Sequence, residues 1–369
     1  MRSAVNWFLF STSSTAMIDL RHNVNTLTRD LRVYLENQVK INLSGSGVGL
    51  SLVLGFGAAY ICYYLSSIAK KPQLITGAET LSQFLQRYCP VVTETYYPTF
   101  WCWEARIQTL LRPFITTKPW VKYRNQLIKT ADGGHISLDW NDSDENALYP
   151  VSATRPIIII LPGLTGTSKE SYILHMVKQS EVLGYRSVIF NNRGVSGEEL
   201  LTPRTYCAAN TEDLETVISH VQNTFAEAPL MAAGVSMGGH RPVLEKSFDI
   251  DYVLKAKTIR EFDERFTSVM FGYQTIADYY RDASPYLKLK SIEIPVLCLN
   301  ALDDVFSPSH AIPMQSAKQN PNVALLLTAH GGHIGFLEGI FPRWATYMDR
   351  VFKQFTQAVF EHRDELKNT

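Results

Sequence analysis

The sequence predicts an α/β fold in which helices cover both faces of a mostly parallel sheet. Short apolar runs of strand length recur along residues 121–369, and Ile157–Leu161 (IIIIL) is the clearest of them. Amphipathic runs of helical length, such as residues 169–183, separate these strands. Strands that alternate with helices favour parallel pairing, and wholly apolar strands indicate burial on both sides of the sheet.

The amino-terminal part contains a long charge-free stretch. Residues 41–69 carry no charged side chain, and residues 48–68 are strongly apolar. About 20 apolar residues at a rise of 1.5 Å each cross the hydrocarbon core of a bilayer. We therefore expect a single transmembrane anchor over residues 46–69, preceded by an amino-terminal segment, 1–45. The flanking basic residues favour a cytosolic amino terminus, a type II arrangement. A buried helix of a soluble domain is the alternative.

Two further regions follow the anchor. Residues 70–120 form a connecting segment rich in aromatic residues and Pro, which could line an acyl-chain pocket, rest on a bilayer or pack as ordinary core. Residues 121–369 form the α/β domain. Its expected strands cover 121–130, 134–141, 157–161, 186–190, 230–235, 295–300 and 323–328. Its expected helices cover 169–183, 211–225, 249–265, 268–280 and 343–366.

Composition excludes several classes of protein. The 35 Lys and Arg residues balance the 35 Asp and Glu residues, so the basic excess of nucleic-acid-binding domains is missing. Five widely spaced cysteines without a C-x-x-C pair do not match a disulfide framework or a cysteine zinc site. We therefore expect neither a nucleic-acid partner nor a metal ion.

A nucleophile motif directly follows one apolar strand. Residues 234–238 read Gly-Val-Ser-Met-Gly, which is the pattern G-x-S-x-G. The turn from strand to helix in this motif is so sharp that the neighbours of the serine must be small, and it lifts the hydroxyl above the sheet. We therefore expect Ser236 to be a catalytic nucleophile.

A serine hydroxyl needs a base, and in this arrangement an acid and then a histidine follow the serine in the chain. Asp303 and Asp304 follow one late strand, and His330 and His333 follow the last strand. We expect Asp303 to be the acid and His333, which has glycine neighbours, to be the base. Asp304 and His330 are the competitors.

Backbone amides must stabilise the negative charge of the tetrahedral intermediate. We expect one such amide from Met237, next to the nucleophile, and a second from Leu164, in the Gly-rich loop after Ile157–Leu161. Loss of one oxyanion donor typically lowers the rate by about 10²–10³.

Longer stretches of the chain point to a family. From Met17 onward the sequence resembles the α/β-hydrolase domain-containing proteins 1 and 3. The most specific stretches are PVVTETYYPT, LPGLTGTSKESYILHM, FNNRG, NTEDLETVI, GVSMGG, DDVFSPSHAIP and GGHIGFLEG. The resemblance implies an α/β-hydrolase fold, a single-pass anchor and a triad of Ser236, Asp303 and His333. It also implies hydrolysis of phospholipid acyl esters, in one branch those of medium-chain phosphatidylcholines, without a cofactor.

One departure from the family lies behind the nucleophile. The family continues after GVSMGG with an apolar helix and another core strand, whereas Pro242 interrupts a helix here. No apolar run of strand length lies between residues 235 and 295. We therefore expect one core strand to be missing through an internal deletion after Gly239. Three functions stay open: a membrane-anchored phospholipase, a catalytically impaired isoform, and a carboxylesterase for neutral lipid esters.

Overall fold

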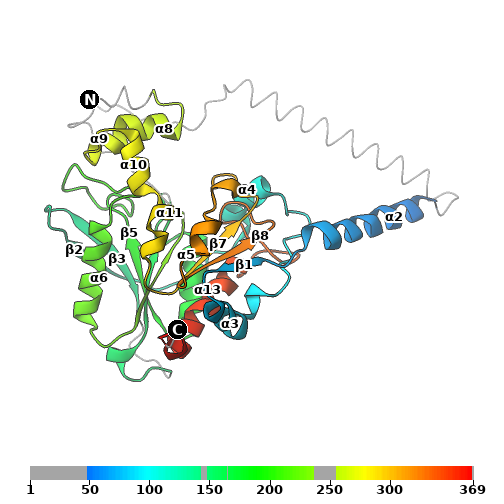
Figure 1. Ribbon diagram of the computed structural model, residues 1–369, viewed down its shortest axis with the longest axis horizontal. Helices are drawn as coiled ribbons and strands as arrows, with labels where there is room; N and C mark the ends of the chain where they lie inside the picture. The colour runs from blue at the N-terminus through cyan, green and yellow to red at the C-terminus, as the bar shows by residue number, and fades with distance from the viewer. Residues whose placement is uncertain (1–47, 143–147, 164, 237–254, 368–369) are drawn as a thin grey trace. The chain divides into compact units, whose positions relative to one another are not determined.

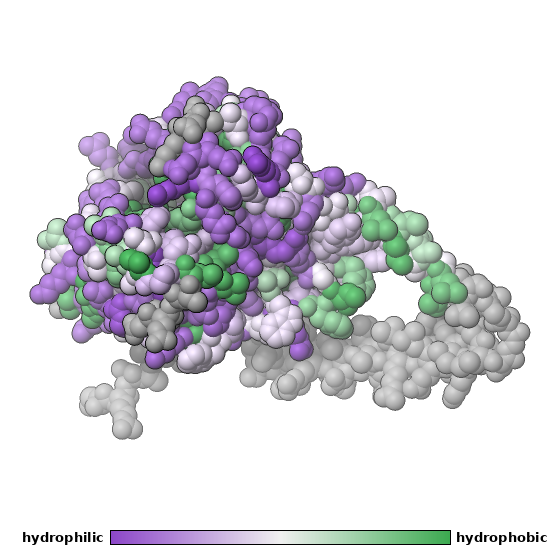
Figure 2. Space-filling view, turned by 90° about the horizontal axis from the view of Figure 1, so that it is seen from below, coloured by the Kyte–Doolittle hydropathy of each residue, from purple (hydrophilic) through white to green (hydrophobic). Residues whose placement is uncertain are grey.

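The structure is a computed structural model that describes residues 48–142, 148–163, 165–236 and 255–367 (Figure 1). The chain divides into two compact units, residues 1–65 and 66–369. The described part of the first unit is the charge-free helix α2 (Val48–Tyr63), and the π-helix η1 (Tyr64–Ile68) follows it. Figure 2 shows hydrophobic surface along α2, where Phe56 is 74 % exposed. In the part of the chain that the structure describes, no helix is both long and apolar enough to span a bilayer.

The described strands of the second unit form two separate sheets. The five-stranded sheet has the order β2-β3-β5-β4-β6, and the three-stranded sheet has the order β1-β8-β7. The strands of the first sheet are β2 (Arg124–Lys129), β3 (His135–Asn141), β4 (Ile157–Leu161), β5 (Arg186–Asn191) and β6 (Leu230–Gly234). Those of the second are β1 (Gln73–Thr76), β7 (Val296–Ala301) and β8 (Val323–Thr328).

Strand direction follows the predicted parallel pattern on one side of each sheet. β4 pairs in parallel with β5 and β6, and β7 pairs in parallel with β8. The pairs β2–β3, β3–β5 and β1–β8 are antiparallel. The sheets are therefore more evenly mixed than the sequence predicted. Strand β1 was not predicted, because a run of four residues is too short to show a periodic pattern.

Helices lie close to their predicted positions. The predicted ones include α5 (Ser171–Val182), α6 (Glu212–Thr224), α10 (Ile276–Ala283) and α13 (Tyr347–Lys367). The predicted helix 249–265 overlaps α8 (Ile259–Phe262) and η5 (Asp263–Thr267), and its residues 249–254 lie outside the described residues. The predicted helix 268–280 contains the short α9 (Ser268–Met270) before α10. Residues 70–120 add two helices that were not predicted, α3 (Glu79–Tyr88) and α4 (Ala105–Ile115).

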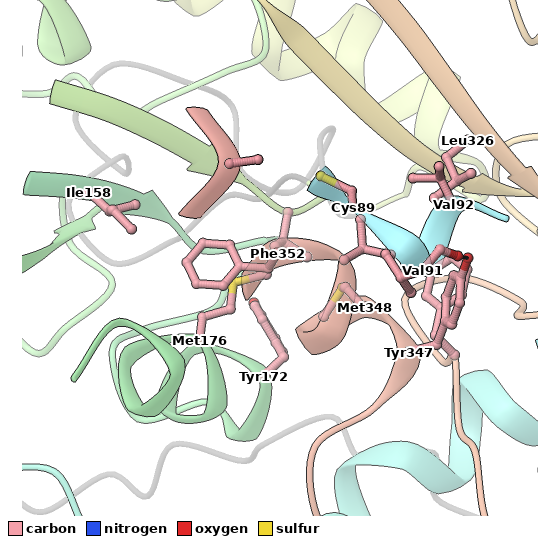
Figure 3. Packing of buried hydrophobic residues seen from close by; sticks show 14 of the residues in the cluster. Cys89, Val91, Val92, Ile158, Tyr172, Met176, Leu326, Tyr347, Met348 and Phe352 are labelled. Carbon is pink, nitrogen blue, oxygen red and sulfur yellow. Dashed lines mark hydrogen bonds between the residues drawn. The ribbon is translucent and has the colours of Figure 1, made fainter. Parts of the chain in front are cut away.

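Both faces of β4 are buried, and successive residues enter different cores. Ile157 and Ile159 pack with Val217 and Val221 of α6 on one face. Ile158 and Ile160 pack on the other face in a core that α3, α5 and α13 also contribute to. Figure 3 shows this core, in which Ile158, Met176 and Phe352 lie together. A strand covered on both sides needs no polar alternation, which explains the run of four isoleucines.

The same core extends under both sheets. It contains Ala324 and Leu326 of β8 as well as Ile158 of β4, although no strand of one sheet pairs with a strand of the other among the described residues. Between β6 and β7 in chain order, the described residues contain helices and no strand. Among the described strands, β6 therefore pairs only with β4, and β7 pairs only with β8. The expected loss of a core strand after Gly239 stays a prediction, because residues 237–254 lie outside the described residues.

Candidate active site

The serine of the nucleophile motif stands just beyond the carboxyl end of β6. Ser236 has φ +43°, the left-handed conformation that a sharp strand-to-helix turn imposes on its nucleophile. Its side chain is exposed, as a nucleophile must be. Gly163, at the end of β4, lies so close that a Cβ atom there would be 3.1 Å from the Ser236 Cβ and 2.8 Å from the Val235 carbonyl oxygen. The loop after β4 thus approaches the serine because it lacks a side chain at this point.

The structure brings Ser236 and His333 together. Ser236 Oγ lies 2.7 Å from His333 Nε2, within hydrogen-bond distance. His333 belongs to the loop after β8, so the pair joins the five-stranded sheet to the three-stranded sheet. The two residues are 97 positions apart in the chain, and the sequence predicted both as members of the site.

The carboxylate beside His333 is Asp304, whereas the sequence analysis favoured Asp303. His333 Nδ1 lies 3.0 Å from Asp304 Oδ2. The other oxygen, Asp304 Oδ1, accepts the backbone N–H groups of Phe306 at 2.8 Å and Ser307 at 3.0 Å. These bonds form a turn that holds the Asp304 carboxylate beside His333. The geometry therefore corrects Asp303 to Asp304 as the partner of His333.

Asp303 instead forms a second carboxylate–imidazole pair. Asp303 Oδ2 lies 3.0 Å from His330 Nδ1, and Asp303 Oδ1 accepts the backbone N–H of Gly332 at 2.9 Å. Trp103 packs edge-on against the His330 ring, with centroids 5.3 Å apart. The two predicted alternatives, Asp303 and His330, thus bind each other and brace the loop that carries His333.

Helix α4 supports the loop that carries His333. The sequence did not predict this support. Thr109 Oγ1 accepts the backbone N–H of His333 at 2.9 Å and donates to the Ala105 carbonyl at 2.7 Å. A Cβ at Gly332 would lie 2.4 Å from the Ala105 carbonyl oxygen, so the loop touches the helix backbone. The glycines on either side of His333 permit this approach, and they were the one available signal of a close-packed loop.

The loop after β4 is held by a buried tyrosine. Tyr172 of α5 accepts the backbone N–H of Gly163 at 2.9 Å with its hydroxyl oxygen. Burial raises the pKa of Tyr172, so the hydroxyl stays neutral at ordinary pH. The predicted oxyanion donors, Met237 and Leu164, lie outside the described residues.

Taken together, the described atoms form a chain from hydroxyl to imidazole to carboxylate. His333 Nε2 faces the Ser236 hydroxyl, and its Nδ1 faces Asp304. In this order the imidazole can take the serine proton while the carboxylate fixes its tautomer and stabilises the imidazolium. The Phe306 ring packs edge-on against His333, with centroids 4.9 Å apart, and limits how far the imidazole can turn.

Comparison with known proteins decides the family. The chain is 61 % identical to "Phospholipase ABHD3" of Homo sapiens over 405 residues, which covers 94 % of this chain and 99 % of the relative. It is 60 % identical to "Phospholipase ABHD3" of Bos taurus over 407 residues, with 95 % and 99 % covered. The chain belongs to the phospholipase ABHD3 family. It is thus a member of a family of lipid ester hydrolases with an α/β-hydrolase fold.

The ABHD3 alignment also exposes a difference in length. It spans 405 positions, whereas the whole chain has 369 residues, so at least 36 positions of the human relative (405 − 369) have no counterpart here. No protein-family model matches the chain. Among solved structures it is similar to an esterase, Pf2001, of Pyrococcus furiosus, at 17 % identity and a TM-score of 0.42, covering 64 % of this chain and 93 % of that one.

Proposed function

We propose that this chain is a serine hydrolase that cleaves acyl esters of phospholipids, phosphatidylcholines with medium-length acyl chains among them. The observation that carries the proposal is the hydrogen-bonded series Ser236–His333–Asp304 in a chain of the ABHD3 family. The catalytic roles of Ser236 and His333 follow the sequence prediction, and Asp304 takes the role first given to Asp303.

The reaction has two steps. Ser236 Oγ attacks the ester carbonyl carbon while its proton passes to His333 Nε2. The bond to the lysophospholipid oxygen then breaks, and His333 returns the proton to that leaving oxygen. Water attacks the acyl-serine in the same way and releases the fatty acid. We assign the oxyanion contacts to the backbone amides of Met237 and Leu164 on the sequence pattern alone.

The decisive experiment is labelling of the full-length chain with a fluorophosphonate probe in detergent. We expect wild-type protein to be labelled and Ser236→Ala to stay unlabelled. The control is Thr216→Ala, which removes a half-buried hydroxyl group of α6 and should leave the labelling unchanged. Folded wild-type protein that resists the probe would overturn the proposal. Lipid profiling of cells that express each variant then separates phosphatidylcholines from neutral esters as substrates.

We further propose that residues 46–69 anchor the enzyme in a membrane by a single pass, with a cytosolic amino terminus. Support comes from the charge-free sequence and from the exposed apolar side chains of α2, among them Val53, Leu54 and Phe56. Extraction of microsomes with alkaline carbonate tests this: wild-type protein should stay in the pellet, and Leu54→Arg combined with Phe56→Arg should release it. Release of the wild-type chain would refute the anchor.

A catalytically impaired isoform is the second candidate for the function of this chain. The observation that favours it is that the described strands form two separate sheets. We propose that the residues missing relative to the ABHD3 relatives lie between β6 and β7, because both strands have an unpaired edge among the described residues. A displacement of about 1 Å at a reacting atom can lower a rate roughly 10²-fold. A chimera that receives the human segment at this place should gain activity. An unchanged rate in a folded chimera would leave the shortened chain as a fully competent enzyme.

A further inference from the structure

Helix α4 presents an apolar stripe to the solvent on the side opposite its buried face. The residues Ala105, Gln108 and Arg112 are buried, and they follow the spacing i, i+3, i+7. Ile107, Leu110 and Phe114 repeat the same spacing two positions later and are exposed, Phe114 by 85 %. Two residues correspond to about 200° around a helix, so the exposed stripe lies opposite the buried one.

A second segment continues this apolar surface. Phe341 and Trp344 are 77 % and 71 % exposed. Their loop is tied to the segment around α4 at two places, because Trp101 donates its indole N–H to the Ile340 carbonyl at 2.8 Å and Thr117 donates its backbone N–H to the Arg343 carbonyl at 2.8 Å. We call the combined surface the aromatic face and define it as Trp101, Ile107, Leu110, Phe114, Phe341 and Trp344.

The charges around the aromatic face are mainly positive. Arg106, Lys118 and Arg343 are exposed beside it. In segments 97–120 and 339–345, the one carboxylate is Glu104, which is half-buried and accepts the backbone N–H of Ile107 at 3.0 Å as a helix cap. Exposed Trp and Phe with Lys and Arg at their margin match the interface of a phospholipid bilayer, where rings enter the headgroup layer and cations meet phosphates.

The aromatic face lies beside the candidate site. Leu110 follows Thr109, which binds the backbone of His333. The acid loop adds two more exposed apolar residues, Val305 and Phe306, and the Phe306 ring contacts His333. An acyl chain that leaves a bilayer at this surface would therefore meet apolar side chains on the way to Ser236.

The first residues of the second unit lie near the segment that carries Trp101. Within that unit, Lys70 pairs with Tyr96 in a β-bridge, and Pro98 pairs with Glu338. The chain that follows α2 is thus fixed next to the start of the segment that carries Trp101 and α4.

We propose that the aromatic face lies on the surface of a phospholipid bilayer and brings the ester from the membrane to Ser236. The proposal rests on the proposed phospholipase function, which it deepens by assigning the surface that receives the lipid. A group of neighbouring exposed apolar side chains indicates an interaction site. The basic residues around the aromatic face favour a bilayer with anionic headgroups over an uncharged protein partner.

The first test measures contact with lipid and does not require activity. The full-length chain is placed in nanodiscs of phosphatidylcholine and phosphatidylserine, with or without brominated acyl chains. Bromine should quench tryptophan emission in wild-type protein, and Trp344→Phe should reduce the quenched fraction. Trp140→Phe, which removes a buried indole of β3, is the control that should leave the quenched fraction of emission unreduced. Equal quenching in wild type and Trp344→Phe would overturn the proposal.

The second test separates membrane docking from catalysis. Leu110→Glu should lower kcat/KM for phosphatidylcholine in vesicles about tenfold, because it places a charge on the docking surface. It should leave hydrolysis of a soluble short-chain p-nitrophenyl ester unchanged. The control Leu127→Glu replaces another exposed leucine, which is 51 % exposed against 68 % for Leu110 and lies on edge strand β2, and it should affect the hydrolysis of neither substrate.

The outcomes distinguish the two proposals. A wild-type chain that is quenched but cleaves neither ester refutes the proposed function and keeps the docking surface. Equal loss of both activities in Leu110→Glu would show that Leu110 is needed for folding and would overturn the docking proposal. An unchanged rate of hydrolysis on vesicles would also overturn it. A shift from dimer to monomer in detergent on Leu110→Glu, with quenching unaffected, would assign the face to a second copy of the chain and also overturn it.

Discussion

The two halves of the candidate site are supported very differently. On the histidine side, Thr109 of α4, Asp303 and Asp304 all bind the loop of His333. On the serine side, β6 pairs with β4 alone among the described strands, and its residues are partly or fully exposed. His333 and Asp304 thus lie in loops that several hydrogen bonds hold, whereas Ser236 follows a strand with one neighbour among the described strands. In the proposed triad, a loss of residues beside β6 would therefore affect the serine more than the histidine.

The largest expected effect separates the two aspartates on the histidine side. Asp304→Asn should lower kcat by about 10⁴, because an amide keeps the shape but holds the imidazole in the wrong tautomer. Asp303→Asn should lower it by less than about tenfold, since the change loosens the loop without touching His333. Steady-state hydrolysis of a soluble ester measures both. A larger loss in Asp303→Asn would return that residue to the triad.

The next largest effect is expected on the free energy of unfolding, which should respond differently to substitutions in β4 and β6. Ile158 of β4 and Met231 of β6 face each other in the sheet register. Ile158→Ala should reduce the free energy of unfolding by 2–5 kcal/mol, roughly the range for a fully buried aliphatic residue. Met231→Ala should reduce it by about 1 kcal/mol, because its side chain is half-buried and leaves a smaller cavity. Urea unfolding in detergent compares the two, and equal losses would mean that β6 is as well packed as β4.

Hydrogen exchange should show the same contrast in the backbone. The amides of β4 are enclosed between β5 and β6, whereas alternate amides of β6 have no strand beside them among the described residues. We expect those amides of β6 to exchange at least about tenfold faster than the amides of β4. Mass spectrometry of peptic peptides measures the rates. Equal protection would reveal a further strand beside β6.

The smallest effect concerns the ion pairs around Arg193, none of which includes Ser236, His333 or Asp304. Arg193 after β5 is buried and binds Asp213 of α6 at 2.7 Å and Asp132 of the β2–β3 turn at 2.6 Å. The hydrogen bond from Arg193 holds the pKa of Asp132 well below its ordinary value of 3.8. A depressed pKa stabilises the folded state above the unfolded pKa, and this stability is lost as the pH falls below about 4.

Asp132→Asn tests this behaviour. The variant should be less stable than wild type at pH 7, and the difference should shrink as the pH falls below the ordinary Asp value. Thermal unfolding at several pH values measures the difference. A constant difference across that range would show that Asp132 carries no linked proton.

Local sequence patterns were sufficient to predict much of this fold. The runs of β4 and β8 were predicted with their observed bounds, since continuous apolar residues of strand length leave few alternatives. Ser236 and His333 were predicted because each follows such a strand and stands among glycines. Helices α3 and α4 were not predicted, because aromatic residues and Pro113 in α4 obscure the helical periodicity of residues 70–120.

The amino-acid sequence alone predicted the class of fold, Ser236 and His333 as members of the candidate site, and the absence of a strand pattern behind Ser236. These features are local, since each depends on a few consecutive residues. The three-dimensional structure was needed to show which aspartate faces His333, that Thr109 holds its loop, and that the described strands form two sheets over one core. Adjacent aspartates have the same composition and spacing, so their roles depend on loop hydrogen bonds. Sheet continuity likewise depends on which edges meet in space, and no single stretch of sequence specifies that.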